Sequence, residues 1–215
     1  MCEKASMDEI DSYIANFITL DNSSLTAVSE QERVRVNVRP SIGPEVGQFL
    51  GLLIRLIQAK RVLEFGTSLG YSAIWLGEAL RTTGGRLISI EREEELYRQA
   101  QKNLAAAGLS DVVELVLGDA RTVVETLEGP FDLIFQDSDK RLYPVLLEKC
   151  IELTRDYGLI VADDALFKPM GRPDPLSEPI HLHNQKVFSD DRLYSTLLPV
   201  GDGVTLSVKR QSGGR

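Results

Sequence analysis

Acidic residues end five successive apolar segments of this 215-residue chain, the pattern with the clearest chemical meaning. If the segments are parallel strands, these acids share the carboxyl edge of one sheet, where open α/β folds bind ligands. A single acid at a strand end usually forms a turn or caps a helix. Five in the same place indicate a binding site, and they are Glu64, Glu91, Asp119, Asp137 and the pair Asp163 and Asp164.

The first three acids suit a ligand that contains adenosine. Glu91 is placed to accept hydrogen bonds from ribose hydroxyls, Asp119 to accept one from an adenine amino group, and Glu64 to bind an ammonium or an ordered water. A glycine turn, 66–70, follows Glu64 and opens a helix whose unpaired N–H groups face a ligand. Its spacing is not the G-x-G-x-x-G that binds a pyrophosphate, so we expect S-adenosylmethionine rather than a dinucleotide. The alternative is a tight turn that only needs small residues.

The remaining acids indicate a metal site. Asp137, Asp163 and Asp164 end neighbouring strands, and three carboxylates come together at low cost only when a cation neutralises them. Oxygen ligands without Cys or His favour Mg²⁺ or a similar ion. Lys140 follows Asp137 by three residues and is expected within reach of that metal. A divalent cation lowers the proton affinity of a nearby lysine, so Lys140 is a candidate general base. The alternatives are that the aspartates cap the next segment and that Lys140 is a surface residue.

Alternating strands and helices must position these groups. The spacing of apolar residues predicts a doubly wound, Rossmann-like α/β fold with a seven-stranded, mostly parallel sheet and a C-terminal antiparallel hairpin. Extra N-terminal helices are expected over 7–20, 24–34 and 42–57, with later helices over 71–80, 93–107, 120–127 and 143–154. A proline-rich loop is expected over 167–182. His181 lies in it and His183 directly follows it, and we interpret both as loop or lid residues rather than ligands. The predicted strands are 61–65, 86–91, 112–117, 131–136, 158–162, 193–198 and 204–208.

Composition limits the possible partners and locations. With 24 Lys+Arg against 32 Asp+Glu, the formal charge of -8 disfavours broad binding to nucleic acid. Neither a membrane-spanning run nor a secretory segment is recognisable, so we expect a cytoplasmic protein without a membrane partner. Length favours a single domain, 1–215, with a helical cover over 1–58 and a sheet core over 60–210. Arg33, Arg35 and Arg39 are expected in a solvated loop or a subunit contact, with binding to a phosphate-bearing substrate as the alternative.

Several motifs in order resemble the cation-dependent O-methyltransferases, which include catechol and caffeoyl-coenzyme A O-methyltransferases and small bacterial enzymes. The segment 62–72, VLEFGTSLGYS, looks like the family's LE(I/L)G-x-x-x-GYS block, and 137–140, DSDK, is similar to its D-A-D-K motif. The segment 198–204, LPVGDGV, resembles its LPxGDG segment. The resemblance implies metal ligation by Asp137, Asp163 and Asp164, and a catalytic base at Lys140. It also implies a cofactor site lined by Ile42, Glu64, Gly66, Thr67, Ser72, Glu91, Asp119, Ala120 and Asp137.

One residue departs from the family pattern, because Asp164 stands where the family usually has Asn. A third carboxylate is expected to bind the cation more tightly and to leave it a weaker Lewis acid. The alternatives are that one carboxyl stays protonated and that the metal role has been lost. The resemblance implies transfer of a methyl group from S-adenosylmethionine to a hydroxyl of a small catechol-like or phenolic acceptor, chelated by Mg²⁺. It also implies a homodimer. The alternatives are methylation of a hydroxylated wobble uridine in tRNA, a NAD-binding oxidoreductase and a non-catalytic cofactor-binding module.

Overall fold

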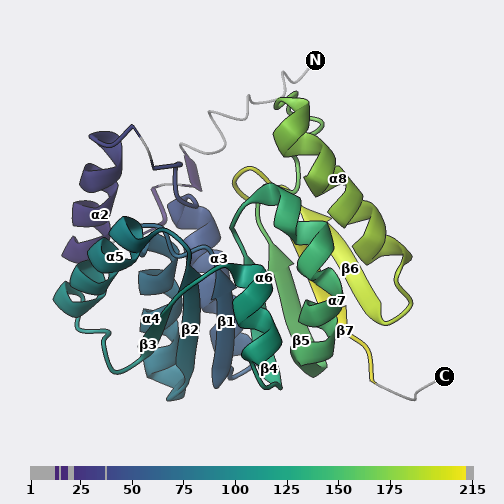
Figure 1. The fold of residues 1–215 in the computed structure, drawn as a ribbon, viewed down its shortest axis with the longest axis horizontal. Helices are drawn as coiled ribbons and strands as arrows, with labels where there is room; N and C mark the ends of the chain where they lie inside the picture. Colours follow the sequence, from purple (N-terminus) through teal and green to yellow (C-terminus); the bar gives the residue numbers. More distant parts are fainter. Residues whose placement is uncertain (1–12, 15, 19–21, 37, 212–215) are drawn as a thin grey trace.

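A seven-stranded sheet runs through the centre of the computed structural model, which describes residues 13–14, 16–18, 22–36 and 38–211 (Figure 1). The strand order is β3-β2-β1-β4-β5-β7-β6, with β1 to β5 parallel and β7 antiparallel to both neighbours. This arrangement confirms the predicted fold class. The bounds are β1 Arg61–Phe65, β2 Arg86–Glu91, β3 Val113–Leu117, β4 Phe131–Gln136, β5 Thr154–Ala162, β6 Leu193–Leu198 and β7 Val204–Lys209.

Strand β1 lies in the middle of the parallel part, between β2 and β4. Its residues Val62, Leu63 and Phe65 are fully buried, because helices cover both faces of the sheet. A parallel strand covered on both faces is apolar on both, which explains the nearly continuous apolar run in the sequence. The glycine turn that follows β1 is therefore held at the centre of the molecule.

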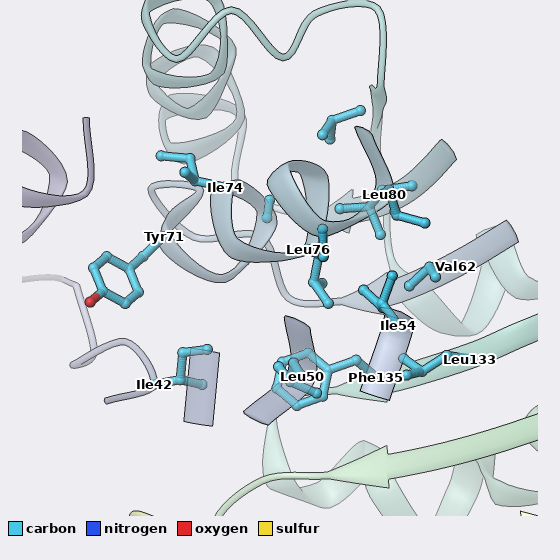
Figure 2. Packing of buried hydrophobic residues seen from close by; sticks show 14 of the residues in the cluster. Ile42, Leu50, Ile54, Val62, Tyr71, Ile74, Leu76, Leu80, Leu133 and Phe135 are labelled. Carbon is cyan, nitrogen blue, oxygen red and sulfur yellow. The ribbon is translucent and has the colours of Figure 1, made fainter. Parts of the chain in front are cut away.

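Four helices contribute to the core cluster on one face of the sheet: α2 Ser23–Arg33, α3 Pro44–Leu56, α4 Tyr71–Thr83 and α5 Glu94–Ala106. Figure 2 shows Leu50 and Ile54 of α3 close to Leu133 and Phe135 of β4, with Leu76 of α4 beside them. Each of these side chains is fully buried and contributes roughly 1.5 to 3 kcal/mol to folding. Pro44 occupies the first turn of α3, where its missing N–H costs nothing.

The opposite face carries a second core cluster, which includes residues of α6, α7 and α8. The helix α8 lies beside α7 and β6 (Figure 1). Two short 3₁₀ helices connect the elements on this side, and the second of them begins at Lys140. The bounds are α6 Ala120–Val123, η1 Val124–Thr126, η2 Lys140–Leu142, α7 Tyr143–Leu153 and α8 Asp174–Ser189.

The predicted loop over 167–182 was wrong in its second half, because α8 begins at Asp174. Pro175 lies in the first turn, where no intrahelical partner exists for its N–H, while Pro179 lies inside the helix. Buried Ile180 and Val187 recur at helical spacing and anchor α8 to the rest of the fold. This packing outweighs the hydrogen bond that Pro179 cannot make.

Other boundaries differ from prediction by a few residues. Strand β5 begins at Thr154 rather than Gly158, and the predicted helix over 120–127 changes to a 3₁₀ turn at Val124. The predicted helix over 7–20 lies largely outside the described residues. Among the described residues, no helix combines the length and the apolar character needed to span a lipid bilayer.

Candidate active site

The turn after β1 adopts a backbone that only glycine accepts without strain. Gly66 has φ +100°, and a Cβ at this position would lie 2.2 Å from the carbonyl oxygen of Asp137. Gly70, with φ +91°, precedes the first residue of α4. The backbone N–H of Asp137 donates to the carbonyl oxygen of Phe65 at 3.0 Å. The glycine turn thus brings the ends of β1 and β4 into direct contact.

A cavity of about 1260 Å³ opens at the carboxyl ends of the parallel strands. Every predicted cofactor, metal and catalytic residue except Glu64 lines this cavity. The structure thus brings together residues at or after the carboxyl ends of five strands and one residue from the segment before α3. The lining members of the predicted set are Ile42, Gly66, Thr67, Ser72, Glu91, Asp119, Ala120, Asp137, Lys140, Asp163 and Asp164.

Glu64 has no exposed surface. Burial raises the pKa of Glu64 to about 7, although hydrogen bonding by the Ser72 and Ser89 hydroxyls offsets part of this shift. Ser72 lines the cavity and Glu64 does not. Glu64 therefore contacts the cavity lining through Ser72, and its role as a cofactor contact stays a prediction.

Two carboxylates are fixed on the side of the cavity formed by β2 and β3. Glu91 accepts hydrogen bonds from the backbone N–H of Ser68 at 2.7 Å and from that of Glu93 at 2.9 Å. Asp119 caps α6 and pairs with the Arg121 side chain at 2.7 Å. Hydrogen bonds from the Arg121 side chain and backbone lower the pKa of Asp119 to about 2. Asp119 is therefore both the helix cap that its position alone would suggest and an ionised acceptor at the cavity wall.

Asp137, Asp163 and Asp164 converge at the ends of β4 and β5. One carboxylate oxygen of each lies within 4.8 Å of the others. Burial, followed by the charges of Asp137 and Asp164, raises the pKa of Asp163. Its buried Oδ1 has no hydrogen-bond partner among the described residues. Three hard oxygen donors with one unsatisfied buried oxygen fit a Mg²⁺-like cation.

Lys140 is 5% exposed and contacts the same cluster. Its Nζ donates to Asp137 Oδ1 at 2.9 Å and to the Tyr143 hydroxyl at 3.0 Å, and it forms an ion pair with Asp164. Burial lowers the pKa of Lys140, but interactions with Tyr143, Asp137 and Asp164 raise it well above its usual value. The sequence analysis expected a lowered pKa for Lys140, but that expectation is for the site with a divalent cation bound. A bound cation would offset the negative charges of Asp137 and Asp164 that raise the pKa of Lys140 in its absence.

Asp164 has φ +62°, a left-handed conformation that asparagine and aspartate accept more readily than most other residues. The backbone at this position therefore fits both the usual Asn of the resembling family and the Asp found here. The change adds a charge and leaves the turn as it is.

The segment between β5 and α8 contributes apolar side chains to the cavity lining. Phe167 packs with Tyr143 and Ile180, and the Arg172 guanidinium lies 5.5 Å from the centre of its ring. Arg172 also pairs with Asp202 at 3.0 Å, which ties this segment to the β6–β7 loop. Sequence reasoning did not find these residues, because they follow no periodic pattern. From residue 142 onward, the apolar residues that line the cavity are Leu142, Leu166, Phe167, Pro169, Met170, Leu176 and Pro199.

The histidines and arginines noted in the sequence lie mostly outside the cavity. His183 is buried on α8, edge-on to Tyr143 at 5.6 Å, and burial lowers its pKa to about 4. It is a core residue of a helix, and the expectation of a loop was wrong. Arg35 pairs with Glu95 at 3.2 Å, and Arg39 lines the cavity mouth.

Comparison with known proteins identifies the family of this site. The O-methyltransferase family matches residues 19–210. A catechol O-methyltransferase of Niastella koreensis is 37% identical over 163 residues, covering 74% of this chain and 73% of that protein. One from Mycobacterium tuberculosis is 34% identical over 167 residues, covering 77% and 76%.

Among solved structures, the O-methyltransferase TomG from Streptomyces achromogenes, involved in tomaymycin synthesis and in complex with SAM, superposes with a TM-score of 0.82. The two chains are 28% identical, and the superposition covers 94% of this chain and 96% of that one. The motifs, the fold and the extent of these matches agree, and the chain belongs to the O-methyltransferase family.

Proposed function

We propose that this protein transfers a methyl group from S-adenosylmethionine to a hydroxyl of a small aromatic acceptor, and that it uses Mg²⁺ or a similar cation. One observation carries the proposal. A single cavity joins the glycine turn and Glu91 to the cluster of Asp137, Asp163 and Asp164, with Lys140 at the junction. Apolar side chains, among them Phe167, Met170 and Leu176, form another part of its lining, which we call the apolar wall.

The chain's residues would hold the cofactor by its two polar ends. Glu91 is oriented by two backbone N–H groups, so its carboxylate is preorganised to accept hydrogen bonds from ribose hydroxyls. Gly66 in the turn and Ser72 in the first turn of α4 both line the cavity, where they would face the amino acid part of the cofactor. A relative that crystallised in complex with SAM has the same fold, which supports this assignment.

Asp137, Asp163 and Asp164 would hold the divalent cation. When bound, S-adenosylmethionine supplies an activated methyl group, and the cation supplies a Lewis acid that favours loss of a proton from an acceptor hydroxyl. Asp164 adds a negative charge to the site. The chain should therefore bind the cation more tightly than an Asp164→Asn variant does, and activate the acceptor less.

Lys140 is the residue that we assign to proton transfer. Its Nζ lies against Asp137 and Asp164 inside the cavity, where an acceptor hydroxyl would be within reach. The apolar wall excludes water and would align a flat ring so that its oxygen faces the methyl group. Together these residues bind, orient and deprotonate the acceptor.

The acceptor class follows from the apolar wall and from the relatives. Phe167, Met170 and Leu176 offer an apolar surface that suits an aromatic ring. Two relatives are named catechol O-methyltransferases. We therefore propose an acceptor with two neighbouring hydroxyls on such a ring. The tRNA and NAD alternatives gain no support from these observations, while the homodimer, the single domain and the cytoplasmic location stay predictions.

A methyl-transfer screen with and without Mg²⁺ tests the proposal. It should include catechols, caffeoyl-type esters and undermodified tRNA, with labelled S-adenosylmethionine as donor. We expect transfer to a catechol-like compound that stops in excess chelator. Calorimetry with S-adenosylmethionine and NAD side by side should show binding of the former alone. Transfer that persists in chelator would contradict the metal role, and binding of NAD alone would contradict the whole assignment.

A further inference from the structure

Tyr143 is a fully buried tyrosine that lies directly behind Lys140. It is the first residue of α7, three positions after the lysine, and none of its surface is exposed. Its hydroxyl accepts a hydrogen bond from Lys140 Nζ at 3.0 Å. A buried tyrosine hydroxyl normally has a specific partner, and here that partner is the proposed base.

The Lys140 ammonium has as many N–H donors as there are acceptors around it among the described residues. An ammonium has three N–H donors, and the described residues offer it three acceptors: Asp137 Oδ1, an Asp164 oxygen and Tyr143 Oη. Two of these belong to carboxylates that a divalent cation would also require. Tyr143 is the one acceptor of the three that a cation would leave to the lysine.

Packing keeps Tyr143 in this position. It belongs to a small apolar cluster with Ala162, Phe167 and Ile180, and the ring of His183 meets it at 86°. These contacts come from β5, from the segment that covers the cavity and from α8. These contacts hold the ring in place, so we expect the hydroxyl to keep its position when the lysine moves.

We propose that Tyr143 is a positioning residue that keeps Lys140 in the active site once the carboxylates are shared with a cation. Lys140 and a divalent cation compete for Asp137 and Asp164, and the hydrogen bond to Tyr143 stabilises the lysine after it has released them. This inference rests on the proposed function for its catalytic consequence. The contact itself also makes a prediction about cation affinity that does not depend on methyl transfer.

The test is a double-mutant cycle of Tyr143→Phe and Lys140→Met, with Mn²⁺ affinity measured by electron paramagnetic resonance. The phenylalanine keeps the ring packing and removes one acceptor. With Lys140 present, we expect Tyr143→Phe to weaken Mn²⁺ binding about three- to tenfold, because the lysine then depends more on the carboxylates. In the Lys140→Met background the same change should have no effect. Exposed Tyr194 provides a control, and Tyr194→Phe should leave the affinity unchanged.

Steady-state kinetics give the second readout. Tyr143→Phe should lower kcat about tenfold and leave KM for the acceptor within about twofold, since the lysine is misplaced and the acceptor wall is intact. Unchanged Mn²⁺ affinity in Tyr143→Phe, or an equal loss in the Lys140→Met background, would overturn the inference. If the wild-type protein transfers no methyl group, the proposed function fails, whereas the Mn²⁺ cycle still decides the role of Tyr143.

Discussion

Replacing Asp164 by asparagine tests how the third carboxylate acts. The left-handed backbone at φ +62° accepts both residues, so Asp164→Asn changes one charge and little else. The charges of Asp137, Asp163, Asp164 and Lys140 sum to -2 when all are ionised, and the variant makes this -1. The site should therefore attract a divalent cation less strongly.

The size of the effect follows from the geometry. A divalent cation and one carboxylate about 4 Å apart interact by about 8 kcal/mol at an effective dielectric constant near 20. The amide oxygen can still act as a ligand, and Lys140 loses one of its partners, so a large part of this energy is retained. We expect a net loss of roughly 1.4 to 2.8 kcal/mol, which is a tenfold to hundredfold weaker cation affinity.

Isothermal titration with Mg²⁺ or Mn²⁺ measures this affinity, and methyl transfer at saturating cation measures kcat. Burial raises the pKa of Asp164, so its charge costs folding energy and the variant should not unfold at a lower temperature at neutral pH. Exposed Asp111 provides a matched control, because Asp111→Asn makes the same charge change far from the cluster. We also expect kcat of Asp164→Asn at saturating cation to equal or exceed that of the wild type. Unchanged or tighter cation binding by Asp164→Asn would refute the reasoning.

Three further changes have defined outcomes. Gly66→Ala should lower the free energy of unfolding by about 2 to 3 kcal/mol, because φ +100° and the nearby carbonyl oxygen exclude a Cβ. A thermal scan should show a melting temperature lower by roughly 5 to 10 °C, and an unchanged melting temperature would contradict this. Burial raises the pKa of Glu64 from 4.5 to about 7, so its contribution to stability is complete below pH 4.5 and is lost as the pH rises through 7. Denaturant titrations should show that, relative to Glu64→Gln, the wild type loses about 3 kcal/mol of unfolding free energy between these pH values. A difference in unfolding free energy that does not change with pH would exclude the raised pKa. Lys140→Ala should abolish methyl transfer, while calorimetry should still detect binding of S-adenosylmethionine to the variant. Turnover by the variant at the wild-type rate would show that Lys140 is not the base.

Much of the fold could be predicted because its signals are local and strong. The buried parallel strands are continuous apolar runs, and the glycines at 66 and 70 mark the turn at the centre of the sheet. The helix α8 could not be predicted as easily. Its prolines suggest a loop, and only the contacts of Ile180 and Val187 with distant elements stabilise it as a helix.

The candidate site also has a part that could be predicted from the sequence and a part that could not. Acids at strand ends could be placed in one cavity, because parallel strands all end at the same edge of the sheet. Which of them line the cavity depends on side-chain packing. Glu64 is fully buried and hydrogen-bonded to Ser72, a detail that the sequence pattern could not predict. Tyr143 and Phe167 were not found, because their roles arise from contacts between α7, α8 and the segment between β5 and α8.

A crystal structure with S-adenosylmethionine and Mn²⁺ bound, with the ion located by its anomalous scattering, tests the central claim most directly. We predict the ion between the carboxylates of Asp137, Asp163 and Asp164, and the adenosine against Glu91. An ion bound elsewhere, with these three carboxylates turned away from one another, would contradict the account.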